Sequence, residues 1–282
     1  MNRFIPFFLV GFAVSFFSCS GSMQQENRIF VTIEPQRYFA ERLAHPFFEI
    51  ETMVAPGTSP ESYDPTPRQM VRLAKSRAYF GIGPLGFELA WLDKLKQNNP
   101  AVLFFDNSRN VSFVAGESHH HGTHGMDPHI WTSPQTALLI VQNMYDALVE
   151  LDPGNRDAYA GNRDDLRREI LQTDTIVRSL LNRSSQKAFI IYHPALTYFA
   201  HDYGLTQYAI ESEGKEPAAE QLKQLIDAGR GTVKTVFIQQ EFDRKNAEIV
   251  AREARCKLVV INPLSYNWSE ETIRIAKALS DE

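Results

Sequence analysis

The stretch NRDAYAGNRDDLRREILQTDTIVRSLL, residues 155–181, decides the fold of this chain. Apolar or aromatic residues recur along it at helical spacing, at Tyr159, Leu166 and Ile170 and again within 176–181, between mostly polar and charged positions. The pattern predicts one long helix with charged outer faces. At about 1.5 Å per residue, such a helix spans roughly 40 Å, more than a crossover between neighbouring strands needs. We therefore predict that it links two lobes, the alternative being an ordinary surface helix.

Short apolar runs alternate with helical patterns on both sides of this helix. Strands are expected at 28–33, 48–54, 78–82, 101–105, 187–192, 206–210, 234–238 and 257–261. Residues typical of helix starts precede four of the intervening apolar runs, namely Thr66-Pro67, Ser133-Pro134, Asp243 and Ser269. Such alternation is the signature of an α/β fold with parallel sheets.

The predicted architecture is therefore α/β, with two Rossmann-like lobes joined by one long linking helix. The expected boundaries are an N-terminal lobe over 28–153, the linking helix over 154–182 and a C-terminal lobe over 183–282. This arrangement places a cleft between two sheets.

The first residues resemble an export signal. Arg3 precedes an apolar run that ends at Phe17, and this run is shorter than the roughly 20 residues of a membrane-spanning helix. Cys19 directly follows a small residue, as at a bacterial lipoprotein cleavage site. We predict a signal peptide over 1–18, a lipid on Cys19 and a polar tether over 19–27, which places the protein on the extracytoplasmic face of a bacterial membrane or in the periplasm.

Composition limits the remaining possibilities. Once Cys19 carries a lipid, Cys256 is the only other cysteine, so neither an intrachain disulfide nor a multi-thiolate metal site can form. We expect Cys256 to be a buried structural thiol. The chain has 29 basic and 34 acidic residues, a formal net charge of −5, and nothing in this balance indicates nucleic acid. An acidic surface is compatible with a cation ligand, although solubility explains it equally well.

Five of the eight histidines lie in the stretch HHHGTHGMDPHIW, residues 119–131. Four of them lie among glycine and serine, a composition typical of a loop that binds metal loosely: His119, His120, His121 and His124. His129 differs, because Pro128 restricts the backbone before it and Ile130-Trp131 behind it is expected to be buried. We predict His129 as a fixed metal ligand, the alternative being a solvated polar loop.

Polar residues follow strand ends at four places. Glu61 lies in the loop after 48–54, His129 in the region after 101–105, and His193 and Asn262 directly after 187–192 and 257–261. Ligands of open parallel sheets bind beyond the carboxyl ends of the strands, so two facing sheets bring these residues together. Two imidazoles and a carboxylate suit Zn²⁺, and nitrogen and oxygen ligands also serve Mn²⁺.

Each of these residues also has a purely structural interpretation. Glu61 is then a loop carboxylate, His193 a core histidine and Asn262 a turn-former before proline. His45 and His201 follow no strand end, which favours surface or core roles for both.

The assembled motifs resemble those of the cluster A-I solute-binding proteins, the metal-binding lipoproteins of bacterial zinc and manganese ABC importers. The resemblance covers nearly the whole chain after Cys19, through the four segments PGTSPESYDPTP, DPHIWTSP, IIYHPALTYFAHDYGL and LVVINPL. It implies a monomeric receptor, anchored to the membrane, that captures Zn²⁺ or Mn²⁺ between two lobes and delivers it to a membrane permease and its ATPase. Members of this family that have a histidine-rich loop before the DPH motif are usually zinc receptors, and residues 117–124 match that loop.

Two positions depart from the family pattern. Glu61 stands where the family usually has its first histidine, and Asn262 stands where it usually has its final aspartate. The two exchanges leave the net charge of the ligand set unchanged, which favours a working divalent site. The exchange of an imidazole for a harder oxygen donor weakens the distinction between zinc and manganese. A water molecule completes the coordination shell of the metal if Asn262 does not bind it, and Glu117 or a loop histidine is a further candidate ligand.

Two other classes of function fit some of these features. A secreted zinc hydrolase also uses three protein ligands and a water, but the chain has no HExxH motif and no GxSxG elbow. We therefore predict that it is not an enzyme. A metal-scavenging or adhesion surface protein without a permease has the same sequence features as an importer receptor. The continuous linking helix leads us to expect little rigid-body motion of the lobes.

Overall fold

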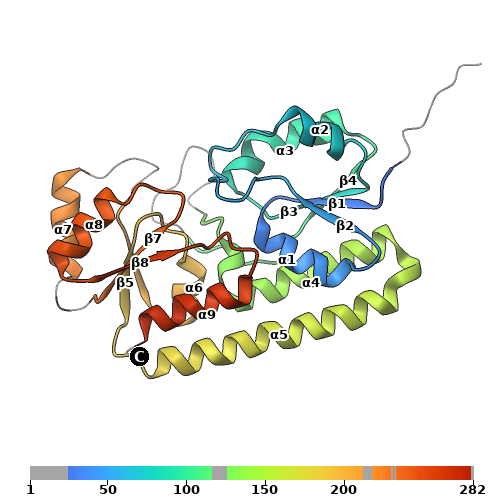
Figure 1. Ribbon diagram of the computed structural model, residues 1–282. Helices are drawn as coiled ribbons and strands as arrows, with labels where there is room; N and C mark the ends of the chain where they lie inside the picture. Colours follow the sequence, from blue (N-terminus) through green and yellow to red (C-terminus); the bar gives the residue numbers. More distant parts are fainter. Residues whose placement is uncertain (1–24, 116–125, 212–217, 230, 232, 281–282) are drawn as a thin grey trace, which may run out of the picture.

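The structure is a computed structural model that describes residues 25–115, 126–211, 218–229, 231 and 233–280. It contains two parallel four-stranded sheets with helices packed against them, and one long helix runs along both (Figure 1). This is the two-lobed α/β architecture predicted from the sequence. Among the described residues, no helix is both long enough and apolar enough to cross a membrane.

The N-terminal lobe is built on a sheet with strand order β2-β1-β3-β4. Its strands are β1 (Arg28–Val31), β2 (Glu49–Thr52), β3 (Ala78–Gly81) and β4 (Leu103–Asp106). Its helices are α1 (Glu34–Ala44), α2 (Pro67–Leu73), α3 (Gly86–Asn98) and α4 (Pro134–Leu151), with the short 3₁₀ turn η1 (Ile130–Thr132) before α4. Strands β1 and β3 are fully buried, as expected for the centre of a parallel sheet covered on both faces.

The C-terminal lobe repeats this plan with strand order β6-β5-β7-β8. Its strands are β5 (Ala188–Ile191), β6 (Thr206–Ala209), β7 (Thr235–Gln239) and β8 (Lys257–Ile261). Its helices are α6 (Thr197–Asp202), α7 (Ala219–Gly229), α8 (Lys245–Ala254) and α9 (Trp268–Leu279). All eight predicted strands are therefore present, and the pairings between these eight strands are parallel.

Helix α5 (Arg156–Asn182) joins the lobes as one uninterrupted helix, after the 3₁₀ turn η2 (Pro153–Asn155). It packs against α1 and α4 of the N-terminal lobe and against α9 of the C-terminal lobe, as Figure 1 shows along the lower side of the molecule. Its buried residues follow the predicted apolar stripe: Tyr159, Leu166, Ile170, Thr173, Val177 and Leu181. The linking helix predicted from residues 155–181 is thus confirmed.

The lobes also share packing and hydrogen bonds away from α5. Tyr198 of α6 and Trp268 of α9 belong to the same buried cluster as the core of the N-terminal lobe. The Tyr198 hydroxyl donates to the carbonyl of Asp127 at 2.8 Å, and the Trp268 indole N–H donates to the carbonyl of Trp131 at 2.7 Å. These contacts lie at the segment that carries His129 and hold it against the C-terminal lobe.

The predicted helix starts agree with the structure to within a residue or two. Thr66 and Ser133 are the N-caps of α2 and α4, and their hydroxyls accept backbone N–H bonds. Asp243 lies two residues before the first residue of α8 and accepts from the N–H of Lys245 at 2.8 Å, whereas the N-cap is Arg244, whose side chain makes no capping bond. Ser269 is the exception, because α9 begins one residue earlier and the Ser269 hydroxyl bonds the carboxylate of Glu169 instead.

Candidate metal site

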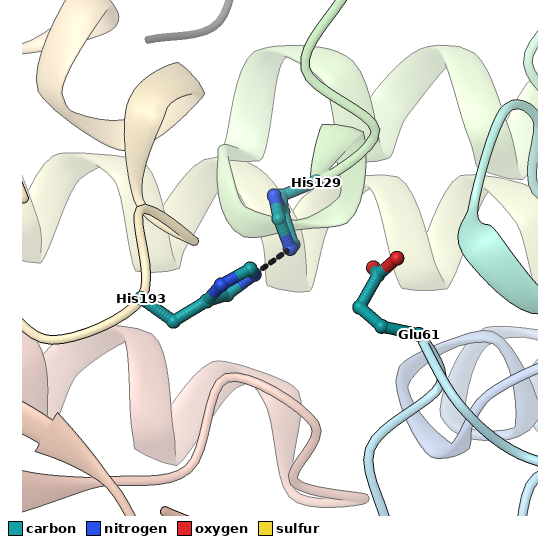
Figure 2. Close-up of side chains that lie close together, drawn as sticks. All are labelled: Glu61, His129 and His193. Carbon is teal, nitrogen blue, oxygen red and sulfur yellow. Dashed lines mark hydrogen bonds between the residues drawn. The ribbon is translucent and has the colours of Figure 1, made fainter. Parts of the chain in front are cut away.

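Three of the four predicted ligands converge between the lobes. Glu61, His129 and His193 each present one ligand atom, and these atoms lie within 4.8 Å of one another. Figure 2 shows the two imidazole rings directed at each other and the Glu61 carboxylate directed toward the space beside them. Glu61 and His129 come from the N-terminal lobe and His193 from the C-terminal lobe. The grouping matches the arrangement expected from the strand ends.

The two imidazoles meet through their Nε2 atoms. The Nε2 atoms of His129 and His193 are 3.2 Å apart. In a tetrahedral zinc site with Zn–N bonds of about 2.0–2.1 Å, two nitrogen ligands are separated by about 3.3–3.4 Å. The observed separation is therefore close to the one that a shared zinc ion requires.

A carboxylate holds the opposite nitrogen of each ring. The Nδ1 atom of His129 lies 2.9 Å from Asp127 Oδ1, and the Nδ1 atom of His193 lies 3.3 Å from Glu211 Oε2. A carboxylate acceptor keeps the ring proton on Nδ1, which leaves the lone pair on Nε2. Two facing lone pairs repel, so this contact requires a cation between them, either a proton or a metal ion.

The electrostatics of His129 and Asp127 agree with this arrangement. Burial of the His129 ring lowers its pKa, but the charge and hydrogen bond of Asp127 outweigh burial and raise the pKa above its ordinary value. Burial raises the pKa of Asp127, but the interactions with His129 outweigh it and leave that pKa lowered. Both shifts describe a ring that favours positive charge at this position. The site is therefore disposed to hold a cation.

The Glu61 carboxylate has an oxygen suited to ligation. Its Oε1 atom is buried and has no hydrogen-bond partner among the described residues. A buried carboxylate oxygen without a partner is costly unless a cation or a donor satisfies it. Glu61 lies in the segment between β2 and α2, where the N–H of Phe87 donates to the carbonyl of Pro60 at 2.8 Å and fixes the loop against α3.

The loop of Glu61 approaches α3 so closely that only glycine fits there. A β-carbon built on Gly86, the first residue of α3, would lie 2.9 Å from the Glu61 Cα and 3.1 Å from its carbonyl oxygen. The missing side chain of Gly86 therefore lets the backbone of Glu61 reach its position in the site.

The cavity around these groups is small. Its volume is about 20 Å³, and its apolar lining includes Trp131, Phe242, Pro263 and Leu264. A single water molecule needs about 10–15 Å³ by this kind of measure, so the cavity holds an ion or a water but no organic substrate. Its size argues against the hydrolase considered above.

Asn262 is placed apart from the other three residues. It lines a neighbouring cavity with Glu34 and Gln240, not the cavity of Glu61, His129 and His193. Its Oδ1 atom accepts from the N–H of Leu264 at 3.1 Å, which makes it a turn-former. Asn262 follows β8 directly, as expected, but the structure gives its side chain a local role, and its part in metal binding stays a prediction.

Several sequence-predicted residues are placed elsewhere or lie outside the described part of the chain. His45 and His201 are exposed, as expected for residues outside the site. Cys256 is only partly buried, and its Sγ donates to the carbonyl of Val233 at 3.3 Å. The segment 1–24, with Cys19, and the segment 116–125, with Glu117 and the loop histidines His119, His120, His121 and His124, lie outside the described residues.

Three carboxylates at the site did not stand out in the sequence. Asp127 precedes Pro128 and His129 in the chain, and this spacing alone could have indicated that it orients the ring. Glu211 follows β6, and Glu241 lies in the turn after β7. Burial raises the pKa of Glu241, and the nearby His193 and His129 lower it less strongly. Nothing local in the sequence distinguishes Glu211 and Glu241 from other loop carboxylates.

Fold and site together define a solute-binding protein with two α/β lobes around a cluster of metal-ligating groups. The family described as zinc-uptake complex component A, periplasmic, matches residues 29–274. The chain belongs to this family. Its members are components of zinc uptake and not enzymes, which confirms the prediction that the chain is not an enzyme.

Individual relatives agree with this assignment. The chain is 25% identical over 257 residues to the high-affinity zinc uptake system protein ZnuA of Bacillus subtilis, covering 86% of this chain and 80% of the relative. It is 26% identical over 271 residues to the zinc-binding lipoprotein AdcA of Streptococcus pneumoniae; the match covers 90% of this chain and 54% of that protein. The chain thus matches only about half the length of AdcA.

A solved structure supports the fold directly. A crystal structure of ZnuA superposes with a TM-score of 0.84 at 34% identity, covering 90% of this chain and 99% of the other. A zinc-bound ZnuA mutant lacking residues 138–173 of its own chain gives the same TM-score and identity. The two-lobed architecture of this chain is therefore that of ZnuA.

Proposed function

We propose that this chain binds one Zn²⁺ ion between its lobes and delivers it to the permease and ATPase of an ABC importer. The observation that carries the proposal is the facing pair of Nε2 atoms of His129 and His193, 3.2 Å apart, beside the buried and unpartnered Oε1 of Glu61. The relatives named for zinc uptake and zinc binding support the choice of ion. Two nitrogen donors favour Zn²⁺, while the carboxylate keeps Mn²⁺ as the second candidate.

The cellular setting forms part of the same proposal. The signal peptide over 1–18 directs export, and a lipid on Cys19 anchors a monomer to the membrane through the tether 19–27. An anchored receptor keeps the captured ion close to its permease. A Cys19→Ser variant of the full chain is expected to leave the membrane fraction, whereas a Ser20→Ala variant is expected to remain in it.

Metal binding is tested by titrating the demetallated protein with Zn²⁺ and Mn²⁺ in parallel. We expect one tight equivalent of Zn²⁺ per chain and weaker binding of Mn²⁺. His193→Ala is expected to abolish the tight class, because the remaining ligands are then under-coordinated. His201→Ala is the matched control, since it removes an exposed histidine of the same lobe. One-to-one tight binding that survives in His193→Ala would refute the site.

Delivery is tested separately from binding. Vesicles containing a zinc ABC permease and its ATPase from the same organism are expected to accumulate zinc only when the zinc-loaded protein is added. Zinc accumulation that is equally fast without the protein would contradict the delivery step while leaving the binding result intact.

A further inference from the structure

The cavity presents three converging ligands, and a tetrahedral zinc site takes four donors. Besides these three, the polar side chains lining the cavity are those of Ser59, Gln239 and Glu241. The Ser59 hydroxyl accepts from the N–H of Glu61 at 3.3 Å. Gln239 is engaged at both ends, because its Oε1 accepts from the N–H of His193 at 3.3 Å and its Nε2 donates to that residue's carbonyl at 2.6 Å. Glu241 remains.

Glu241 is held beside His193 by its neighbour in the chain. The ring of Phe242 stacks on the imidazole of His193, with the centroids 5.5 Å apart and the planes at 24°. The N–H of Phe242 donates to the carbonyl of Gln239 at 3.2 Å and closes the turn after β7. This stacking fixes the backbone of Glu241 next to the ring that bears the ligand nitrogen.

The Glu241 carboxylate would break few hydrogen bonds by rotating toward the site. Within the described residues, its hydrogen-bond donor is the backbone N–H of Glu241 itself. It lines the cavity but is not one of the groups whose ligand atoms lie within 4.8 Å of one another, so ligation requires rotation about its side-chain bonds. The competing residue Asn262 lines a different cavity and uses its Oδ1 in a turn.

We propose that Glu241 supplies the fourth ligand of the bound ion, in place of Asn262. The inference rests on the proposed function. Each lobe then contributes two ligands, Glu61 and His129 from one and His193 and Glu241 from the other. The two carboxylates balance the charge of a divalent ion, which lowers the cost of holding it in a cavity with apolar walls.

The test compares two substitutions at the candidate fourth position with a matched control. Glu241→Gln keeps the shape of the side chain and removes its charge, Asn262→Ala removes the competing oxygen, and Glu248→Gln changes an exposed glutamate of α8. Zinc affinity is measured by competition with a chelator, and thermal unfolding of each demetallated variant checks that it folds. A crystal structure of the unaltered protein loaded with zinc identifies the donors.

We expect Glu241→Gln to lose more than about tenfold in zinc affinity, by analogy with the loss caused by removing groups around a metal site. Asn262→Ala and Glu248→Gln are expected to stay within about threefold of the unaltered chain, and the Glu241 carboxylate is expected on the ion in the crystal. Affinity of Glu241→Gln equal to that of Glu248→Gln would overturn the inference, as would a crystal with water or Asn262 in the fourth position. Lack of tight zinc binding by the unaltered chain would overturn the proposed function and this inference together.

Discussion

Substitution of Gly86 by alanine should weaken metal binding although Gly86 carries no ligand. The added β-carbon would lie 2.9 Å from the Cα of Glu61 and 3.1 Å from its carbonyl oxygen, whereas ordinary contacts begin at 3.4 Å. The loop must therefore retreat by about 0.5 Å, and close-packed interiors transmit such a shift rather than absorb it. Metal–ligand distances in proteins vary by only about 0.2 Å. A shift of the loop by about 0.5 Å therefore takes the Glu61 carboxylate out of its coordinating position.

The expected loss is about ten- to a hundredfold in zinc affinity, the range found when groups that position ligands are removed. This corresponds to about 1.4–2.8 kcal/mol of binding free energy. The assay is competition with a chelator of known zinc affinity at fixed pH and ionic strength. Thermal unfolding of the demetallated protein shows whether the substitution also affects folding.

Gly161 provides a matched control within the same chain. It lies in α5, and a β-carbon built on it meets nothing within 4 Å. Gly161→Ala is expected to stabilise the fold by up to about 1 kcal/mol, because alanine is the better helix former, with no change in zinc affinity. Equal zinc affinities for Gly86→Ala and Gly161→Ala would refute the positioning role of Gly86.

Three further predictions concern protons, ring orientation and the histidine-rich loop. A proton on Nε2 of His129 competes with the metal, so zinc affinity should fall as the pH falls below the raised pKa of His129. The fall should begin above the ordinary histidine pKa of about 6.5 and reach about tenfold per pH unit. A zinc binding constant that does not change between pH 8 and 5.5 would contradict this prediction. Asp127→Asn should reduce zinc affinity by about ten- to a hundredfold, because a neutral amide oxygen accepts the His129 Nδ1–H bond more weakly than a carboxylate and makes the ring a poorer donor to the metal, whereas the exposed Asp157→Asn should have no effect in the same titration. Deletion of residues 117–124 should remove the weaker additional zinc equivalents seen by calorimetry and spare the tight one; loss of the tight equivalent would place a loop residue in the main site.

The sequence predicts the fold well because periodicity and length carry most of the information. Central strands such as Phe189–Ile191 read as continuous apolar runs, and the stripe from Tyr159 to Leu181 identifies a helix too long for a single lobe. The start of α9 shows the limit of such patterns. Ser269 resembles an N-cap in the sequence, but its hydroxyl donates to the carboxylate of Glu169, which is 100 residues away in the chain. A contact over that separation cannot be predicted from the residues around Ser269.

The candidate site is predictable only where a local pattern marks a residue. Glu61 lies in the loop after a predicted strand, His129 is marked by Pro128 and by Ile130-Trp131, and His193 directly follows a predicted strand and precedes a proline. Asn262 has the same sequence context, yet its side chain turns to the N–H of Leu264, because a short amide before proline readily closes a turn. The orienting carboxylate Glu211 is 18 residues from His193 in the chain, and only the pairing of β5 with β6 brings the two together.

Helix α5 has a consequence for how fast an ion leaves. It is continuous and packs against helices of both lobes, so separating the lobes would require it to bend or to lose those contacts. The segment of Glu61, between the end of β2 at Thr52 and the start of α2 at Pro67, contains neither helix nor strand, so it can move by releasing its contacts with α3 while the lobes stay packed. The dissociation rate of the ion should therefore depend on the stiffness of this one loop, so cargo residence time can be tuned there without altering the scaffold.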